Sequence, residues 1–368
     1  MKKTYRIILN LLKKSVLGND FAFTAETISE AEWEEMLKFA IEQGVAPILM
    51  TEIEKLPKTI LPHKNVLLKW FGYKMSWTVQ YKRKFILSCD FANSLEQNGA
   101  KCLVLKGFTT ASYYPIPETR VFGDLDCFLV SSNVDIEKPM FEIGNEVAHK
   151  MGYIVEDAGY KHTHIHYKNL LIENHKYFTN FDETKQGVKI ERLLRHLVLD
   201  GKSQCLGNTN LWKPSPEFNV IFLLKHSLGD FIANDMALKS LYDWAMFLKT
   251  EQENIDWSRM FTMLEDCKLK NFFYLMTETC MVYLGLQLHV KGLSIISQRS
   301  MVNDMINDVL YKPSVSCGHL NLWQKIPNIL KRFKRQYKYR KIETENVFTL
   351  ICNTITFSSF LHRKVTLD

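Results

Sequence analysis

Most of the chain has apolar residues at helical spacing, and one central stretch does not. Before residue 99, apolar positions recur as they do on one face of an amphipathic helix. Ser29 and Glu32 form a capping-box pattern directly ahead of such a run, which predicts a helix that begins there and ends near Gly44. Residues 64–98 contain no proline and predict one long helix.

Residues 99–188 instead contain short apolar runs bounded by turn residues, which are typical of strands. Strands are predicted at 102–105, 125–130, 153–156, 163–168 and 170–177, with a helix over 136–151. Helical spacing returns after residue 189 and predicts helices over 218–231, 235–249, 257–264 and 271–284. The predicted fold class is α+β, with an N-terminal helical region 1–98, a mixed-sheet core 99–188 and a C-terminal helical region 189–368.

Two acidic residues stand at the start of the strand predicted over 125–130. Asp124 and Asp126 are two positions apart, so their side chains project from the same face. Like charges this close to an apolar interior repel each other and are costly to keep ionised. A divalent cation relieves both problems, because Mg²⁺ prefers oxygen ligands and commonly bridges carboxylates to phosphates. The pair therefore predicts a metal site; the alternative is a turn acid beside a chance acid.

A glycine turn precedes these acids. An apolar strand run ends in Lys106 and Gly107, and a short helix is predicted directly after them. Backbone N–H groups at such a turn suit an anion, and Lys106 and Arg120 would add positive charge. The alternatives are a solvated Lys106 and an Arg120 that simply pairs with Asp124 or Glu118.

The order of these motifs carries a family resemblance. With Leu-Lys-Gly, Tyr-Pro, Arg and Gly-Asp-Leu-Asp in sequence, the chain resembles the nucleotidyltransferase superfamily, most closely an uncharacterised bacterial branch. The matched residues are Leu105, Lys106, Gly107, Tyr114, Pro115, Arg120, Gly123, Asp124 and Asp126. The match covers residues 100–130 and 162–177. It implies a fold of the DNA polymerase beta type.

The resemblance also implies a third carboxylate on a later strand, which here matches Glu173, followed by His175. Asp124, Asp126 and Glu173 would be the catalytic and metal-binding residues, with Mg²⁺, or Mn²⁺ in its place, as the cofactor. The implied nucleotide contacts are Lys106, Gly107, Thr109, Arg120 and Gly123. The implied reaction transfers a nucleoside monophosphate from a triphosphate to an acceptor hydroxyl and releases pyrophosphate. Glu173 would act as a ligand or as a general base, and an exposed edge-strand Glu is the alternative.

One position departs from the superfamily pattern. Gly or Ser normally follows the glycine, whereas Phe108 follows Gly107 here. A nucleotide-binding or regulatory protein without turnover is therefore a second hypothesis. A third is a glycosyltransferase, since such enzymes also use Asp-x-Asp, but the helical character of residues 1–98 argues against it. The acceptor stays open between a small molecule, a sugar, a protein side chain and an RNA end.

Composition describes an ordinary soluble globular protein, with 46% hydrophobic and 24% charged residues among 368. No stretch approaches the roughly 20 apolar residues of a membrane span, and the N-terminal pattern does not fit a signal peptide. The eight cysteines are scattered without Cys-x-x-Cys pairs, which predicts reduced thiols and a cytoplasmic location.

The basic character of the chain is local. Seven of the 47 Lys and Arg residues lie in 331–341, and the others are balanced by the 40 Asp and Glu residues. This run interleaves Phe and Tyr with the basic residues, so it is predicted either as a solvated helix face or as a contact for an anionic partner such as RNA. With the apolar segment 347–361, a membrane surface is a further alternative.

Histidines complete the candidates. His162, His164 and His166 share one strand face, but alternate residues on a strand lie about 6.5–7 Å apart and no Cys completes a ligand set, which argues against zinc. A face toward solvent or substrate is predicted. His226 and Asp243 lie on apolar helical stripes, and the preferred interpretation is a buried pair that joins two helices. The resemblance implies the alternative, helices that cover the catalytic cleft.

Overall fold

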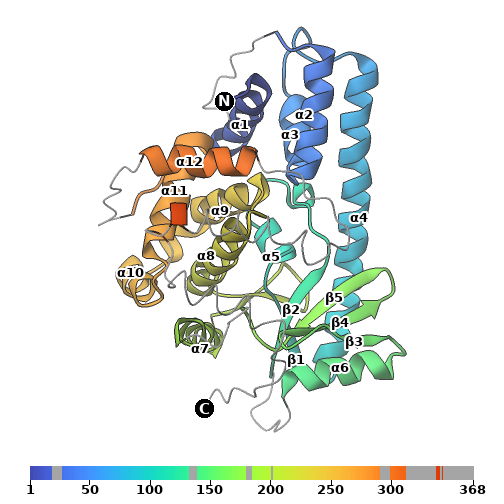
Figure 1. The fold of residues 1–368 in the computed structure, drawn as a ribbon. Helices are drawn as coiled ribbons and strands as arrows, with labels where there is room; N and C mark the ends of the chain where they lie inside the picture. Colours follow the sequence, from blue (N-terminus) through green and yellow to red (C-terminus); the bar gives the residue numbers. More distant parts are fainter. Residues whose placement is uncertain are drawn as a thin grey trace, which may run out of the picture.

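The computed structural model describes residues 1–18, 27–131, 139–179, 185–199, 202–290, 299–311, 337–339 and 342. These residues form twelve α-helices and one seven-stranded mixed sheet, which confirms the predicted α+β class (Figure 1). Most of the basic run 331–341 and all of the apolar segment 347–361 lie outside the described residues.

The N-terminal helices follow the predicted pattern. They are α1 (Lys3–Leu17), α2 (Glu30–Glu42), α3 (Ala46–Ile53) and α4 (Lys64–Glu96). The capping box is present, because the Ser29 hydroxyl accepts from the Glu32 N–H and the Glu32 carboxylate accepts from the Ser29 N–H at 2.8 Å. The predicted long helix is confirmed as α4, whose 33 residues run the length of the molecule (Figure 1).

The sheet has the strand order β3-β4-β5-β2-β1-β7-β6. Its strands are β1 (Ala100–Val104), β2 (Leu125–Ser131), β3 (Val155–Asp157), β4 (His162–Tyr167), β5 (Leu170–His175), β6 (Gln204–Cys205) and β7 (Leu211–Lys213). β2 pairs antiparallel with β1 and parallel with β5. The predicted motifs therefore lie on or next to three neighbouring strands. β6 and β7 come from the region predicted as helical. They have two and three residues, too few for periodicity to reveal them.

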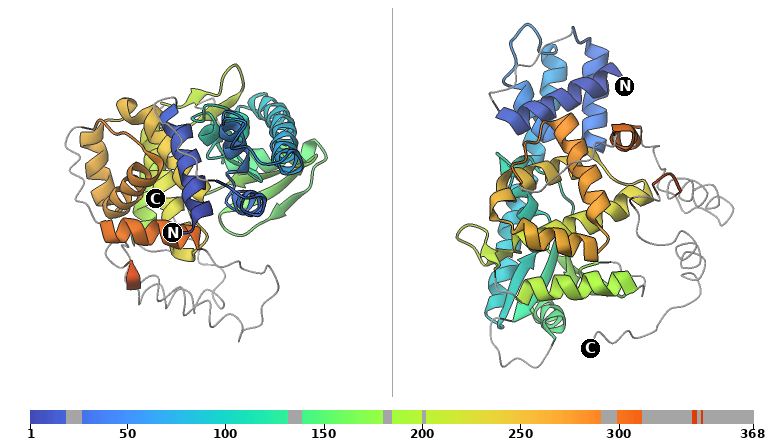
Figure 2. Two further views of the ribbon diagram at one scale, coloured as in Figure 1. Left: turned by 90° about the horizontal axis from the view of Figure 1, so that it is seen from above. Right: turned by 90° about the vertical axis from the view of Figure 1, so that its left-hand side faces the viewer.

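The remaining helices lie beside the sheet or pack on one another. They are α5 (Phe108–Ala111), α6 (Met140–Lys150), α7 (Lys185–Leu199), α8 (Pro216–Ala233), α9 (Leu238–Glu251), α10 (Trp257–Asp266), α11 (Lys270–Leu284) and α12 (Arg299–Leu310). Cys127 and Leu129 of β2 belong to a core shared with α4 and α6. Leu103 of β1 belongs to the core that contains α8 and α9. Figure 2 shows α4 on one side of the molecule and the yellow and orange helices α8 to α11 on the other.

The first and last helical regions share one core. Ser15 of α1 lies 2.7 Å from the Tyr242 hydroxyl of α9, and Gln43 accepts from the Leu238 N–H at 2.8 Å. Apolar residues of α1, α2 and α3 belong to the same buried cluster as those of α8, α9 and α11. The division of the chain at residues 98 and 188 stays a prediction.

Gly144 is expected to be intolerant of substitution because α6 packs closely on the sheet. A Cβ at this position would lie 2.5 Å from Leu129 Cδ1 and 2.9 Å from Asn174 Nδ2, and both partners are buried. Gly144→Ala is expected to destabilise the protein by about 1–3 kcal/mol. Gly72→Ala in α4, with open space around it, is expected to stabilise it by about 0.5–1 kcal/mol. Melting temperatures of the two variants measure both effects. Equal shifts in the same direction would contradict the close packing of α6 at Gly144.

Candidate active site

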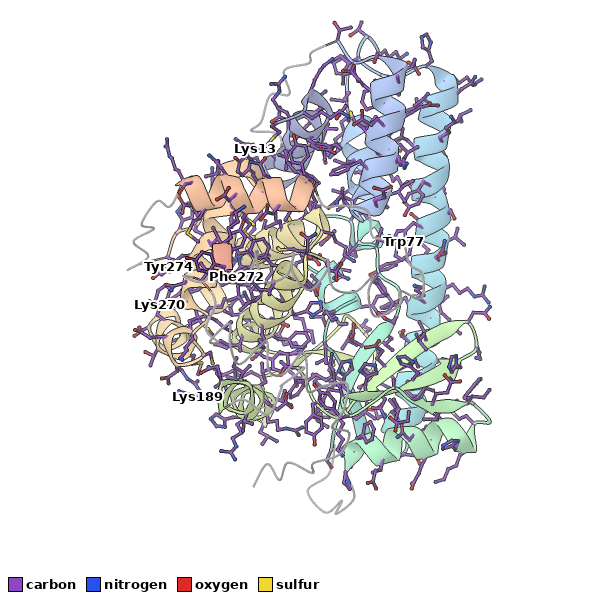
Figure 3. All side chains as sticks on the ribbon, in the orientation of Figure 1. Lys13, Trp77, Lys189, Lys270, Phe272 and Tyr274 are labelled. Atoms are coloured by element: carbon purple, nitrogen blue, oxygen red, sulfur yellow. The ribbon has the colours of Figure 1, made fainter. Side chains whose placement is uncertain are left out.

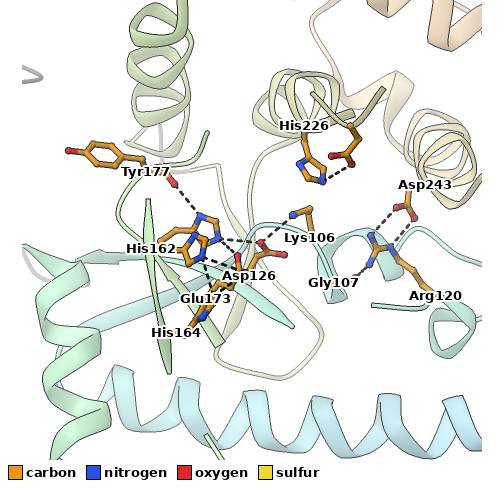
Figure 4. Close-up of polar contacts among 12 residues, drawn as sticks. Lys106, Gly107, Arg120, Asp126, His162, His164, Glu173, Tyr177, His226 and Asp243 are labelled. Carbon is orange, nitrogen blue, oxygen red and sulfur yellow. Dashed lines mark hydrogen bonds and ion pairs between the residues drawn. The ribbon is translucent and has the colours of Figure 1, made fainter. Parts of the chain in front are cut away.

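Three carboxylates from neighbouring strands converge at one place. Asp126 on β2 is directly opposite Glu173 on the parallel strand β5, and Asp124 precedes β2 by one residue. Asp126 is 5% exposed, whereas Asp124 and Glu173 are half-buried. Figure 4 shows Asp126 and Glu173 side by side. The structure therefore brings together the three acids that the sequence singled out.

Asp126 lies between Lys106 and His175. Lys106 Nζ lies 3.3 Å from its Oδ1 atom, and His175 Nε2 lies 3.2 Å from the same atom. Burial raises the pKa of Asp126, but Lys106 and His175 outweigh burial and hold this pKa well below its usual range. Burial likewise lowers the pKa of Lys106, and the Asp126 carboxylate raises it to a higher value than usual. Both groups are therefore charged at neutral pH.

The other two acids respond differently. Burial raises the pKa of Asp124, and the negative charges of Asp126 and Glu173 raise it further. Burial also raises the pKa of Glu173, but its hydrogen bond with His175 prevails and the pKa is lowered. Repulsion therefore falls mainly on Asp124, the residue with no cationic side chain among the described residues close enough to form an ion pair.

Two strand histidines join the acids. His162 Nε2 and His164 Nε2 each lie 3.7 Å from Glu173 Oε1, and the two imidazole nitrogens are 3.3 Å apart. His166 instead pairs with the exposed Glu156 at 3.0 Å. His162 and His164 thus belong to the site, and His166 lies outside it.

The turn at Gly107 has the conformation that its glycine allows. Its φ is +51°, and a Cβ would meet the Phe122 ring at 3.5 Å. Phe108 turns into an aromatic cluster and is 2% exposed, with Phe122 at a ring distance of 4.8 Å. The bulk of Phe108 therefore lies outside the cavity. Thr109 is also buried, and its hydroxyl donates to the Val104 carbonyl at 2.5 Å, so it holds the turn.

Arg120 has a partner that the sequence pattern did not indicate. Its Nε and Nη2 atoms donate to both carboxylate oxygens of Asp243 at 2.8 and 2.9 Å, not to Asp124 or Glu118. Nη1 donates to the Gly107 carbonyl at 3.2 Å. Trp77 of α4, labelled in Figure 3, donates to the Arg120 carbonyl at 3.2 Å. Arg120 therefore links the turn, α9 and α4.

The predicted pair of His226 with Asp243 is wrong. His226 contacts Asp230, one turn along α8, at 3.3 Å, while Asp243 accepts from Arg120 and from the Tyr114 hydroxyl. His226 and Asp243 both line a cavity of about 220 Å³ that also contains Asp124 and Asp126. The alternative implied by the resemblance, helices that cover the cleft, describes this arrangement.

Lys239 of α9 also lines this cavity, and the sequence pattern did not single it out. Its Nζ donates to the Val121 carbonyl at 2.9 Å. Burial, with a smaller contribution from Arg120, lowers the pKa of Lys239 to about 8. Lys239 and Asp243 are four positions apart, and this spacing on one helix face was the available signal.

The donor set fits a divalent cation. Asp124, Asp126 and Glu173 supply the oxygen ligands that Mg²⁺ and Mn²⁺ prefer. The ligand atoms of His162, Glu173 and His175 also lie within 4.8 Å of one another. Burial and repulsion by Asp126 and Glu173 raise the pKa of Asp124, and a cation here would relieve the repulsion.

A mixed sheet that presents an Asp-x-Asp pair to a cavity with lysine side chains, with a third carboxylate on the neighbouring strand, defines a nucleotidyltransferase class of protein. Comparison with protein-family models agrees, because the family described as "Uncharacterised nucleotidyltransferase" matches residues 29–285, more than two-thirds of the chain. The chain belongs to this family, which confirms the predicted resemblance and makes it a transferase. The match begins at the cap of α2 and ends just after α11.

No curated protein and no solved structure matches the chain. Within the part of the chain that the structure describes, no helix has the length and apolar character needed to cross a membrane.

Proposed function

We propose that this protein transfers a nucleoside monophosphate from a nucleoside triphosphate to an acceptor hydroxyl, with Mg²⁺ or Mn²⁺ as its cofactor. The observation that carries the proposal is the convergence of three carboxylates at β2 and β5, two of which, Asp124 and Asp126, line a cavity together with lysine side chains. Carboxylates and lysines at one place suit a metal-bound triphosphate.

The proposed reaction is an in-line displacement. The acceptor oxygen forms a bond to the α-phosphorus, the bond to the bridging oxygen breaks, and pyrophosphate leaves with the electron pair. A divalent ion bound by the carboxylates would neutralise phosphate charge and lower the pKa of the acceptor hydroxyl. Glu173 acts either as a ligand or as the base for the hydroxyl proton. Its lowered pKa keeps it ionised, as both roles require.

We assign the phosphate side of the cavity to Lys106, Gly107 and Gly123, which line it. Arg120 also lines the cavity, and its link to the Gly107 carbonyl would keep the turn in place for the phosphates. Thr109 serves the same turn from inside through its bond to Val104. The acceptor is a small molecule, a sugar, a protein side chain or an RNA end, and the cytoplasm stays the predicted location.

A thermal-shift screen with ATP, GTP, CTP and UTP, each with and without Mg²⁺, tests the proposal. Metal-dependent stabilisation by at least one triphosphate is expected, because binding to the folded state raises its stability. Absence of stabilisation by any triphosphate would refute the proposal. Stabilisation by UDP-sugars alone would instead favour a glycosyltransferase, and triphosphate binding without pyrophosphate release across many acceptors would favour a regulatory protein.

Triphosphate affinity is expected to fall as pH rises above about 8, the pKa of Lys239. Above this pH the Lys239 amine of the unliganded protein is largely neutral. A bound triphosphate favours the protonated amine, so binding must take up a proton. The affinity falls by at most about tenfold per pH unit, and below the pKa of Lys239 this group causes no pH dependence of the affinity. Lys239→Arg stays charged and is expected to remove the dependence. Affinities of a fluorescent triphosphate from pH 7 to 9.5 check this; an unchanged slope in the variant would exclude Lys239.

A further inference from the structure

The histidines around Glu173 add nitrogen atoms that could bind a metal ion to a site that otherwise consists of carboxylates. His175 is buried on β5 and His162 is half-buried on β4, and the two residues face each other in the strand register. Both rings point their Nε2 atoms at Glu173, at 3.3 and 3.7 Å. Figure 4 shows His162 and Glu173 beside Asp126.

The tautomer of His175 is fixed by the backbone. Its Nδ1 atom lies 3.1 Å from the Tyr177 carbonyl oxygen, which can only accept a hydrogen bond, so Nδ1 carries a hydrogen. Nε2 then faces Asp126 Oδ1 at 3.2 Å and Glu173 Oε2 at 3.3 Å. A lone pair cannot face two carboxylates without a positive charge between them, so this position holds either a proton or a cation.

The spacing suits a cation. Two ligands on one metal ion at about 2.1 Å lie about 3.0–3.5 Å apart at octahedral or tetrahedral angles. The separations of His175 Nε2 from Asp126 and Glu173 fall within this range. A hydrogen bond from the second ring nitrogen to a carbonyl is also the usual way in which a metal-binding histidine is oriented.

His162 adds a second nitrogen to the same group. Its Nδ1 atom is buried and has no hydrogen-bond partner among the described residues, so the polar contacts of the ring are those at Nε2. One ring nitrogen of His162 lies within 4.8 Å of the ligand atoms of both Glu173 and His175.

We infer that Glu173, His175 and His162, with Asp126, form a mixed nitrogen–oxygen site for a divalent transition-metal ion, in preference to Mg²⁺. Imidazole favours transition metals, whereas Mg²⁺ is bound by oxygen ligands and water. The inference rests on the proposed function for the use of the ion but not for its binding. Asp124 and Asp126 keep the triphosphate side, and the nitrogen ligands define the ion beside Glu173.

The experiment uses Mn²⁺ alone, added to the full chain without nucleotide. Pulsed electron paramagnetic resonance is expected to show ¹⁴N coupling on the bound Mn²⁺, which about a hundredfold excess of Mg²⁺ does not remove. His175→Gln and His162→Gln are expected to lose or reduce the coupling and to weaken Mn²⁺ binding at least about tenfold. His166→Gln, on the same strand face but paired with Glu156, is the matched control and should keep both.

Bound Mn²⁺ without ¹⁴N coupling would overturn the inference and would assign a proton to His175. Absence of Mn²⁺ binding in the wild-type protein, or unchanged binding in both histidine variants, would overturn it as well. If His175→Gln does not fold, the half-buried His162→Gln decides the outcome. The proposed function is tested apart from this, since Mg²⁺-dependent triphosphate binding without ¹⁴N coupling would support the function and refute only the nitrogen ligands.

Discussion

Asp126→Asn is expected to abolish metal-dependent triphosphate binding and to slow pyrophosphate release on the order of a thousandfold, the loss of several kcal/mol of charge stabilisation. Asp126 is the acid that both Lys106 and His175 contact, and it stands between Asp124 and Glu173 at the centre of the three. An amide keeps the shape of the side chain but removes its charge. Triphosphate affinity with and without Mg²⁺ and the rate of pyrophosphate release measure the effect.

The control for this variant lies in the same sheet. Glu156→Gln removes an exposed carboxylate on β3 that pairs with His166 outside the site, so triphosphate affinity is expected to be unchanged. If Asp126→Asn binds triphosphate in the presence of Mg²⁺ as tightly as Glu156→Gln does, the acid pair is not a metal site. A loss of binding in both variants would indicate a general effect of charge.

The strands that carry the acids were predictable because their signals are local. The run from Leu125 to Ser131 alternates sides within seven residues, and Asp126 shares its face with Asp124. Pairing of β2 with β5 then brings Glu173 opposite Asp126, which the family resemblance implied through the order of motifs. Phe108, the departure from that pattern, turned out to be an aromatic core residue outside the cavity.

The other wall of the cavity was not predictable in the same way. Asp243 lies 123 positions after its partner Arg120, and no local spacing connects them. Lys239 and His226 reach the cavity only because α8 and α9 pack over the sheet. A polar residue on an apolar helix stripe gives the same sequence pattern whether it joins two helices or lines a cleft. Only the tertiary packing distinguishes the two.

The buried ion pair between Arg120 and Asp243 is expected to be among the costliest polar contacts to break. Arg120→Met leaves the Asp243 carboxylate buried, with Tyr114 as its remaining donor among the residues that the structure describes, so the free energy of unfolding is expected to fall by about 3–5 kcal/mol. The double variant Arg120→Met/Asp243→Leu removes both charges and is expected to recover much of this loss. Urea unfolding of the wild type, the single variants Arg120→Met and Asp243→Leu, and the double variant gives the coupling energy between the two side chains.

An exposed ion pair provides the comparison. Lys69 and Glu34 are 2.5 Å apart, but their side chains are 58% and 52% exposed, so Lys69→Met is expected to cost less than about 1 kcal/mol. The difference follows from solvent, because water readily replaces the lost partner of the exposed Glu34, whereas the Asp243 side chain is only 11% exposed. If Arg120→Met costs no more than Lys69→Met, or if the double variant is less stable than both single variants, desolvation is not what makes this contact costly to break.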